Sequence, residues 1–379
     1  MNDIFKSTSD YSYQRIREIV TTAQMGVART VNTAQVVSNW LIGREIVDAE
    51  QHGQQRAEYG EQQLKKLAQQ LKQDFGAGYS YTNLKLMRQF YLSFPDLLSM
   101  PETDATAIGH ALRDQSLSSS QITDLSRPNP TWQPGQLHPN LSWTHYRTLM
   151  KVDRPEPRAF YEIEALKNHW SARELERQIN SLLFERLAKS KDQAGLMELA
   201  TQGQTIQQPT DVFKDPVVIE FLGLPESPRL TESELEAALI TNLQSFLLEM
   251  GRGFAFVDRQ RRITLDGDHF YIDLVFYHTI LKCYILIDLK VGKLTHSDLG
   301  QLQFYVNYYD QECCAKDDNP TLGLILCTDK NDAVVKYTLG QNQHNTIFAS
   351  RYKLHLPTEA ELQAEIRREM SQLQSNFPE

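Results

Sequence analysis

The chain has 379 residues, a length that favours two folded domains over a single hydrophobic core. Its hydrophobic content of 41% and its charged content of 23% are those of ordinary folded proteins. The formal net charge of −9 argues against a protein that coats nucleic acid or membranes by bulk electrostatic attraction. The charge is uneven: residues 1–190 hold 22 basic and 21 acidic side chains, whereas the remainder holds 17 and 27, a balance of −10.

Cysteine usage and hydropathy indicate the compartment. The four cysteines form no CxxC pair, and Cys283 and Cys327 lie in strand-like runs, so we interpret them as small core residues in a reducing cytoplasm. Residues 1–20 lack a basic stretch followed by an apolar one, and no apolar run approaches the roughly 20 residues that a membrane span needs. We therefore expect a soluble cytoplasmic protein without a membrane partner.

Helical patterns come first along the chain. Residues 11–50 show apolar side chains at steps of three and four, and after a polar break at 49–60 a second helix is predicted over 61–76. A glycine turn and the N-cap candidate Ser80 precede a third helix. Residues 61–93 thus match the outline of a helix-turn-helix, whose second helix carries Lys85 and Arg88 for DNA. An ordinary helical hairpin with a solvated polar face is the alternative.

Residues 96–140 change character, because they are rich in Pro, Ser, Thr and Asp and predict a loop-rich insert. Helices are predicted again over 142–152, 154–170 and 171–190, with Ser142 and Ser171 as N-caps. A polar stretch over 191–211 then separates this part from the rest. We expect an all-α N-terminal domain over 1–190.

From residue 231 the pattern alternates between helix and strand. A helix over 231–251 begins at a capping box of Thr231 and Glu234 and ends at Gly251. Strands are predicted over 254–265, 270–278 and 283–290, with a hairpin turn at 266–268. A helix over 295–310, a strand over 321–327, a short helix over 330–339, a strand over 346–354 and a charged helix from 357 follow. This order predicts an α/β domain over 205–379, with a mixed β-sheet sandwiched by helices.

Three charged residues lie in or at the ends of two of these apolar strands. Asp273 interrupts one, and Asp288 and Lys290 close the next. Buried charges need a partner or a metal, and two converging carboxylates suit Mg²⁺ or Mn²⁺. A lysine beside them can hold the attacking water, activate it as a catalytic base, or stabilise charge on a phosphate, as metal-assisted phosphodiester hydrolysis requires. A pair of strand-end salt bridges is the alternative.

Neighbouring residues extend this pattern. Glu236 falls on the apolar stripe of its helix and is a candidate third metal contact, with a helix-border glutamate as the alternative. Gln301, in the helix after Lys290, can hydrogen-bond a phosphate or a water, and an ordinary polar residue on a helix is the alternative. Basic side chains that can meet a phosphate backbone, or merely face solvent on a hairpin, are Arg259, Arg261 and Arg262.

A family resemblance covers nearly the whole chain except residues 96–140. The spacing of the acidic residues and the lysine, behind a glutamate-bearing helix, resembles the PD-(D/E)XK nuclease core of restriction enzymes and junction resolvases. The closer resemblance is to the YhcG family of bacterial proteins, and its segments are "FGAGYSYTNLKLMRQFYLSFP", "WSARELERQINSLLFERLAKS", "DPVVIEFLGL", "GRGFAFVDRQRRITLDGDHFYIDLVFYH" and "LKVGKLTHSDLGQLQFYVNYYD".

The resemblance implies a role for each matching residue. The first acidic position of the family falls on Asp273, its (D/E)XK motif on Asp288 and Lys290, its helix glutamate on Glu236 and its helix glutamine on Gln301. The chain departs from the superfamily pattern in having isoleucine at position 272 in place of proline. It also has aspartate, one methylene shorter than glutamate, at the (D/E) position. Neither departure removes a chemical group from the site.

The resemblance implies a restriction-endonuclease-like fold and nuclease activity, but its motifs do not disclose the substrate. We expect a Mg²⁺- or Mn²⁺-dependent nuclease that hydrolyses DNA in repair, recombination or defence, with RNA still open as substrate. The helical domain would bind DNA or mediate assembly, and we expect a homo-oligomer. The alternative is a catalytically weak nuclease fold that serves as a DNA-binding or assembly module. The complete set of site residues favours the enzyme, and the balance of −10 in the C-terminal half favours the module.

Overall fold

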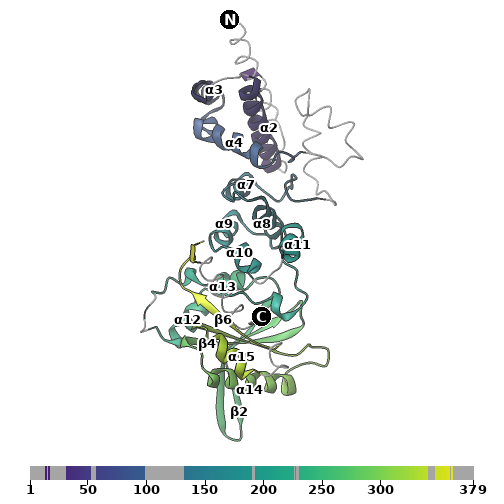
Figure 1. The fold of residues 1–379 in the computed structure, drawn as a ribbon, viewed down its shortest axis with the longest axis vertical. Helices are drawn as coiled ribbons and strands as arrows, with labels where there is room; N and C mark the ends of the chain where they lie inside the picture. Colours follow the sequence, from purple (N-terminus) through teal and green to yellow (C-terminus); the bar gives the residue numbers. More distant parts are fainter. Residues whose placement is uncertain are drawn as a thin grey trace, which may run out of the picture. The chain divides into compact units, whose positions relative to one another are not determined.

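The structure is a computed structural model that describes residues 13–14, 16–17, 31–52, 57–98, 132–189, 193–225, 227, 230–339, 346–358 and 360–361. The chain divides into two compact units, Met1–Glu176 and Arg177–Glu379, and each is described by itself. Figure 1 shows the helices of the first unit and the sheet of the second. The predicted domain ranges 1–190 and 205–379 stay predictions.

The described part of the first unit is helical. It contains α2 (Val31–His52), α3 (Ala57–Phe75), a 3-10 turn (Ala77–Tyr79), α4 (Tyr81–Ser93), α7 (Trp143–Leu149), α8 (Pro155–Lys167) and the beginning of α9 (Ala172–Asn180). The prediction of Ser80 as an N-cap is confirmed, because its hydroxyl accepts the amide N–H of Asn83. Residues 18–30 of the predicted first helix and residues 99–131 of the predicted insert lie outside the described residues.

Close packing of α2 on α4 organises this unit. Gly43 of α2 lies so near α4 that an added Cβ would stand 2.1 Å from the carbonyl oxygen of Met87. Leu84 and Phe90 of α4 are fully buried, and the ring of Phe90 also contacts that of Tyr146 in α7, with centroids 5.0 Å apart. Apolar residues at helical spacing therefore meet across the two helices, as the periodicity of the sequence predicts.

The predicted helix over 171–190 is interrupted. It consists of α9 and of α10 (Leu183–Ala188), and Leu182 between them has a left-handed backbone with φ of +55°. The side chain of Arg186 donates a hydrogen bond of 2.9 Å to the carbonyl oxygen of Ser181 at this break, so the buried backbone that follows α9 is satisfied from within the fold. The polar stretch over 191–211 contains a helix that was not predicted, α11 (Gln193–Gln202), in which Leu199 is buried.

The second unit is built on a mixed sheet of six strands in the order β1-β6-β5-β4-β3-β2. The strands are β1 (Val217–Val218), β2 (Phe254–Leu265), β3 (Asp268–His278), β4 (Cys283–Lys293), β5 (Leu322–Asp329) and β6 (Ile347–Lys353). The hairpin and β4 are antiparallel, whereas β4, β5, β6 and β1 are parallel to one another. The predicted mixed sheet is confirmed, and β1, which pairs with a strand far along the chain, was not predicted.

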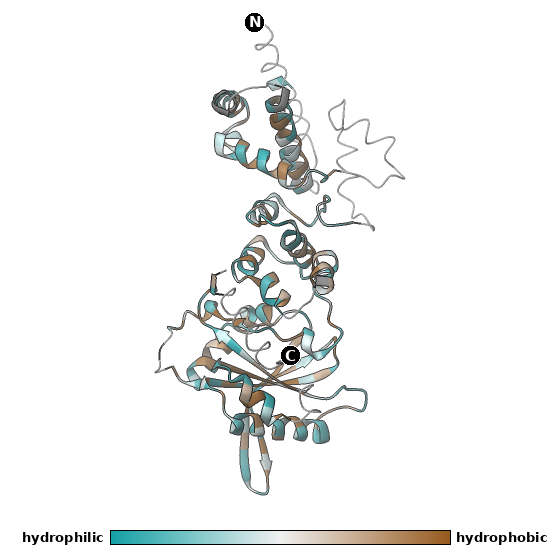
Figure 2. Ribbon diagram, viewed as in Figure 1, coloured by the Kyte–Doolittle hydropathy of each residue, from teal (hydrophilic) through white to brown (hydrophobic). Residues whose placement is uncertain are grey.

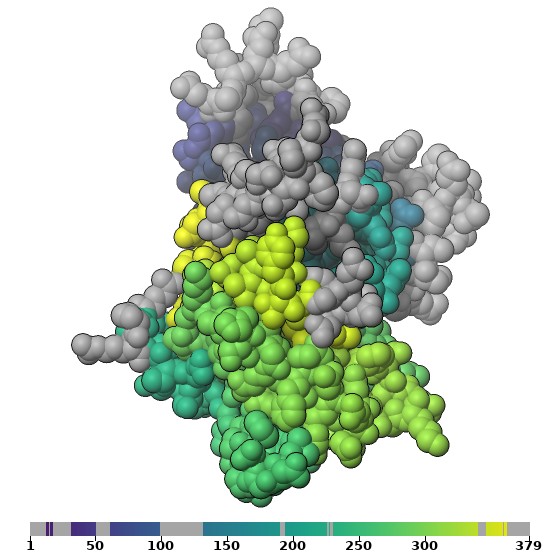
Figure 3. All heavy atoms as spheres, turned by 60° about the horizontal axis from the view of Figure 1, so that its bottom comes forward, coloured from purple at the N-terminus to yellow at the C-terminus, as the bar shows by residue number. Residues whose placement is uncertain are grey.

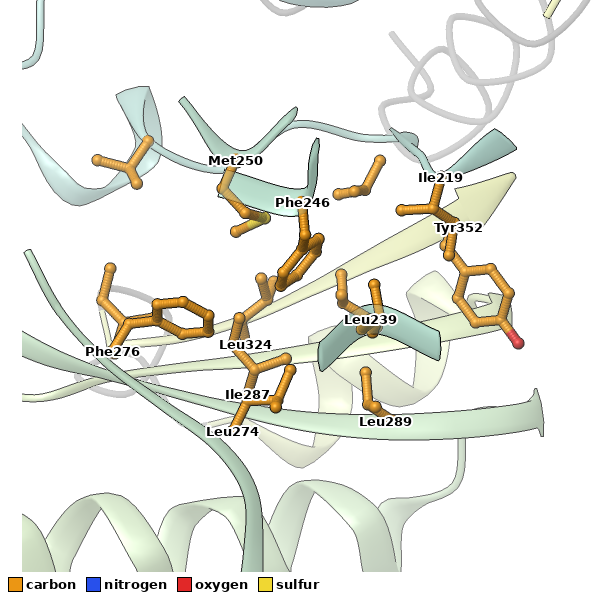
Figure 4. Packing of buried hydrophobic residues seen from close by; sticks show 14 of the residues in the cluster. Ile219, Leu239, Phe246, Met250, Leu274, Phe276, Ile287, Leu289, Leu324 and Tyr352 are labelled. Atoms are coloured by element: carbon orange, nitrogen blue, oxygen red, sulfur yellow. The ribbon is translucent and has the colours of Figure 1, made fainter. Parts of the chain in front are cut away.

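Helices cover both faces of this sheet. One face carries α12 (Glu232–Thr241) and α13 (Leu243–Met250), and the other carries α14 (His296–Glu312) and α15 (Asp332–Thr338). Figure 4 shows Leu239, Phe246 and Met250 packed over Leu274 and Ile287 of the sheet. The second core lies beneath α14, and the apolar colouring of Figure 2 follows the central strands between the two layers. The predicted sandwich is therefore confirmed.

Two further predictions differ in detail from the structure. The helix predicted over 231–251 is divided into α12 and α13 at Asn242, whose side-chain amide donates a hydrogen bond of 3.0 Å to the carbonyl oxygen of Ala238. Its capping box at Thr231 and its end at Gly251 are confirmed. Most of the terminal helix predicted from residue 357 lies outside the described residues.

Two of the cysteines and the hydropathy of the described helices agree with the sequence-based predictions. Cys283 and Cys327 are free thiols that are buried in the two cores of the sheet unit, as predicted. Among the helices that the structure describes, none combines the length and the apolar character that crossing a membrane demands.

Candidate active site

The candidate site forms where β3 and β4 separate. The antiparallel ladder between these strands runs from His278 and Cys283 to Leu274 and Ile287 and ends there. Its next pair would be Asp273 and Asp288, so the register places both aspartates opposite each other at the fork. The amide N–H of Leu289, which has left the ladder, donates instead to Oδ2 of Asp273 at 2.8 Å.

Asp288 is the buried member of the pair, with 2% of its surface exposed. Nζ of Lys290 lies 3.1 Å from its Oδ2, as expected for two side chains on the same face of a strand. Apart from this ionic contact, no donor among the described residues reaches that buried oxygen in hydrogen-bond geometry. Burial, with a further contribution from the charge of Asp273, raises the pKa of Asp288 to about 7, although Lys290 opposes the shift. Lys290 thus compensates the charge of this carboxylate only in part.

Lys290 is partly buried among acidic groups. Burial works against its charge, but Asp288, Glu232 and Asp273 outweigh that effect, so the pKa of Lys290 is raised. Oε2 of Glu232, at the start of α12, lies 3.9 Å from Nζ, and its Oε1 accepts the amide N–H of Val291 (3.3 Å). The lysine is therefore held as an ammonium group beside Asp288.

Glu236 approaches the fork from α12. It is 8% exposed, and its Oε2 accepts a hydrogen bond of 2.6 Å from Nε2 of Gln260 on β2. The same nitrogen donates to Oδ1 of Asp273 at 3.0 Å. Burial raises the pKa of Glu236, with a smaller upward contribution from the charge of Asp273. The structure thus joins Glu236 to Asp273 through one amide group.

Gln260 and Glu232 were not predicted to be parts of this site. A signal for Gln260 was present, because a two-residue turn centred on residues 266 and 267 places position 260 opposite position 273. Glu232 gave no such signal, since an acidic residue in the first turn of a helix is common for reasons of helix stability alone.

Gln301 lies on α14 and does not contact the carboxylates directly. Its side-chain amide donates to the hydroxyl of Tyr305 at 2.7 Å. Burial raises the pKa of this tyrosine, and the charges of Asp288 and Asp273 raise it further. Gln301 is thus connected to the surroundings of the fork through Tyr305.

The three arginines of β2 are exposed, and Figure 3 shows the β2–β3 hairpin as a green lobe at the bottom of the view. Arg261 pairs with Asp258 at 3.2 Å. The positive charge of Arg259 acts on Glu236 and favours its ionised form, after the larger effects of burial and of Gln260. Arg262 is the cross-strand partner of Tyr271. Basic groups therefore follow the strand that leads into the site.

In the first unit, the two predicted DNA contacts lie on α4. Lys85 is exposed, and its Nζ stands 5.6 Å from the centre of the Tyr81 ring. Nε of Arg88 lies 2.8 Å from Oε2 of Glu50, so this guanidinium is engaged inside its own unit. The helix, short turn and helix of the predicted motif are present over α3 and α4.

Comparison with known proteins shows the family. Residues 210–367 match the family described as "YhcG PDDEXK nuclease domain", and residues 15–186 match the "DUF1016 N-terminal domain". A protein of Escherichia coli (strain K12) named "Putative nuclease YhcG" is 36% identical over 381 residues, which cover 96% of this chain and 96% of that relative. The chain belongs to the YhcG family. It therefore carries a PDDEXK nuclease domain after a helical N-terminal region.

Two solved structures are similar to the YhcG-family chain over a smaller part. One is the "crystal structure of a repair endonuclease from Pyrococcus abyssi", at 16% identity, 35% of this chain, 50% of the solved chain and a TM-score of 0.25. The other is "Structure of EndoMS-dsDNA2 complex", at 17% identity, 35% and 49% coverage and a TM-score of 0.25. The matches span about half the length of those solved chains.

The side chains of this YhcG-family site have the oxygen ligands that a divalent cation requires. Carboxylate oxygens are the ligands that Mg²⁺ and Mn²⁺ prefer, and Oδ2 of Asp288 is a buried oxygen without a hydrogen-bond donor. Among the residues with described positions, however, no three His, Cys, Asp or Glu side chains form a preformed metal cluster. The side-chain amide of Gln260 donates to both Glu236 and Asp273, and the ammonium group of Lys290 pairs with Asp288. The carboxylate oxygens suit a hard cation as ligands. In this structure the same oxygens are held by hydrogen bonds from Gln260 and by the ion pair with Lys290.

Proposed function

We propose that the chain is a divalent-metal-dependent nuclease that hydrolyses phosphodiester bonds in DNA. The observation that carries this proposal is Asp288: a buried carboxylate, opposite Asp273 at the strand fork, with an ammonium group 3.1 Å away. A buried carboxylate is costly, and the pKa of Asp288 stays raised beside Lys290, so a bound cation would add to the positive charge that this carboxylate needs. Membership of a nuclease-domain family supports the same reaction class.

Asp273 and Asp288, with Glu236 as a third contact, would hold Mg²⁺ or Mn²⁺. When bound, such an ion polarises the phosphoryl group and lowers the pKa of a coordinated water. Leu289 and Gln260 orient Asp273 through one hydrogen bond to each of its oxygens. Glu236 is oriented by the same glutamine. The carboxylates are thus set by contacts from the protein itself.

Lys290 would stabilise charge on the phosphate. A general base has to be deprotonated before it can accept a proton, whereas the raised pKa of Lys290 keeps it protonated near neutral pH. Its ammonium group can meet the negative charge that develops on phosphorus or orient the attacking water. Gln301 would support this region through Tyr305.

Contacts to the nucleic acid backbone would come from Arg259, Arg261 and Arg262 on the exposed β2 strand. Lys85 of α4 is a further candidate contact, and Arg88 could take part only by leaving Glu50. The three arginines of β2 would give DNA a local positive surface within the otherwise acidic residues 191–379.

The test has two parts. Mg²⁺-dependent cleavage is measured on duplex, branched and single-stranded DNA and on RNA, and Mn²⁺ binding is measured by calorimetry without nucleic acid. Asp288→Asn should weaken Mn²⁺ binding by tenfold or more and abolish cleavage. Asp317→Asn, the same change at an exposed aspartate, serves as the matched control. Unchanged Mn²⁺ binding in Asp288→Asn would refute the metal site, and cleavage of RNA alone would refute DNA as substrate.

A second candidate is a DNA-binding or assembly module with little activity. The acidic balance of residues 191–379 and the lack of a preformed metal cluster among the described residues favour it. It predicts a homo-oligomer whose assembly is independent of metal, and light scattering of the full chain with and without Mg²⁺ tests this. A cleavage rate that depends on both Mg²⁺ and Asp288 would contradict the module.

A further inference from the structure

Gln260 occupies a special backbone position at the candidate site. It lies directly across from Asp273 in the β2–β3 hairpin, between the pairs Arg259–Leu274 and Arg261–Ile272. Its φ is +45°, in the left-handed region that a side chain with a Cβ seldom adopts within a strand. The strain has to be offset by contacts of this residue in the fold.

The partner strand is irregular at the same level. Ile272 packs in the core beneath α14, whereas Leu274 packs in the core beneath α12 and α13. Residues two apart on a regular strand face the same side, so the alternation of side chains breaks at Asp273. Irregularities at opposed positions of both strands turn Gln260 and Asp273 toward each other and toward Glu236.

The side-chain amide of Gln260 donates a hydrogen bond to each of the two carboxylates. Its nitrogen has two hydrogens, and it lies 2.6 Å from Oε2 of Glu236 and 3.0 Å from Oδ1 of Asp273. Each carboxylate therefore receives a donor from one planar group. Without it, two acidic side chains from different elements would face each other with no shared donor and would repel.

We propose that Gln260 is a positioning residue, which holds Glu236 and Asp273 at a fixed separation so that they can share a divalent cation. This inference rests on the proposed function, because it requires a cation at the carboxylates. Each accepting oxygen keeps a second lone pair beside its bond to the amide. The glutamine therefore acts through its two carboxylate partners, and its own carbonyl oxygen is not needed as a ligand.

Gln260→Gly is the informative variant, because glycine accepts a positive φ without strain. The variant removes the amide with its two hydrogen bonds and relieves the backbone strain, so these two effects on the thermal melting temperature should oppose each other. Mn²⁺ affinity of the full chain, measured by calorimetry without nucleic acid, should fall by about 10- to 100-fold, the range found when a group that orients a metal ligand is lost. Lys282→Gly is the matched control: it has a φ of +50° on the other hairpin turn and should leave Mn²⁺ affinity unchanged.

A double-mutant cycle with Glu236→Gln separates positioning from a general structural effect. If Gln260 acts through Glu236, its removal should change Mn²⁺ affinity much less in the Glu236→Gln background than in the wild type. Equal effects in both backgrounds would show that the glutamine acts independently of Glu236 and would refute the inference. This comparison uses affinity differences, so it stays informative if Gln260→Gly is also less stable.

The remaining outcomes are also decisive. Unchanged or tighter Mn²⁺ binding in Gln260→Gly would refute positioning, and tighter binding would mean that the amide competes with the cation. If the wild type itself binds no Mn²⁺, the metal part of the proposed function fails and this inference fails with it. If the wild type binds Mn²⁺ and only the Gln260 variants behave otherwise than expected, the proposed function stands without this inference.

Discussion

Replacing Glu249 with glutamine should destabilise the sheet-containing unit strongly. This α13 side chain is fully buried, and its oxygens accept hydrogen bonds from Arg186 (2.5 Å), Arg177 (3.1 Å) and the amide N–H of Val218 (2.9 Å). The side chain of Lys214 donates to its backbone carbonyl oxygen. The variant would leave the fully buried Arg186 without its counter-charge.

The magnitude follows from two independent arguments. Burial disfavours the charge of Glu249, but Arg186, Lys214 and Arg177 outweigh it and lower its pKa from an ordinary 4.5 to about 2. At about 1.4 kcal/mol for each pKa unit, the fold favours the ionised form by about 3 kcal/mol. Breaking a buried ion pair from one side costs about 3–5 kcal/mol, which agrees. Because the folded pKa is depressed, this stability is present above pH 4.5 and is lost as the pH falls toward 2.

The assay has to observe the correct unit. All four tryptophans lie in residues 1–176, so their fluorescence reports on that unit, and amide hydrogen exchange of β4 reports on the sheet. At pH 7, Glu249→Gln should lower the free energy of opening of β4 by about 3 kcal/mol. Glu220→Gln, which removes a partly exposed partner of Arg177, should cost about 1 kcal/mol or less. A loss below about 1 kcal/mol in Glu249→Gln would refute the argument that this charge is structural.

Three further predictions concern the site and the helical unit. Lys290→Ala should leave the melting temperature and Mn²⁺ affinity nearly unchanged but slow cleavage about 100-fold or more, and a destabilised variant with wild-type cleavage would refute the catalytic assignment. Burial raises the pKa of Glu162 to about 8. The free energy of unfolding of the helical unit should therefore rise by about 1.4 kcal/mol for each pH unit as the pH falls from 8 toward 5. Urea unfolding monitored by tryptophan fluorescence should show this slope in the wild type and its loss in Glu162→Gln. In the same assay Gly43→Ala should lower the free energy of unfolding by about 1–3 kcal/mol, because its Cβ would meet the backbone of Met87. Gly78→Ala, whose Cβ would meet no atom within 4 Å, should be neutral. Equal stabilities of the two variants would refute the close contact of α2 and α4.

Local signals explain most of what the sequence predicts correctly. The cap at Ser80, the capping box at Thr231 and the end at Gly251 each depend on residues within one helical turn, and each is present. The mixed sheet was predictable because its strands are long, apolar and separated by clear turn residues. Two carboxylates and a lysine near two strand ends could also be found, because charges inside apolar runs are conspicuous.

Long-range contacts explain what the sequence does not predict. After the break at Leu182, Arg186 donates hydrogen bonds to Pro216 and Glu249, which lie 30 and 63 residues further along the chain. Likewise β1 depends on backbone pairing with Tyr352 and Lys353. Short elements of this kind have no periodicity of their own. Gln260 differs, since the hairpin register placed it opposite Asp273, but its bond to Glu236 needs the position of α12. The register of the hairpin can be predicted from the sequence of its turn, whereas the packing of α12 beside the hairpin cannot.

The order of strands in the sheet has a consequence for synthesis of the protein. The meander of β2, β3 and β4 pairs within a short segment and can form as soon as that segment leaves the ribosome. The parallel half needs β5 and β6, and β1 must wait about 130 residues for its neighbour. Until β5 arrives, β4 presents an unpaired edge whose residues from Ile285 to Leu289 are buried in the finished protein. A nascent or truncated chain that stops in α14 would expose this edge and would be prone to aggregate through it.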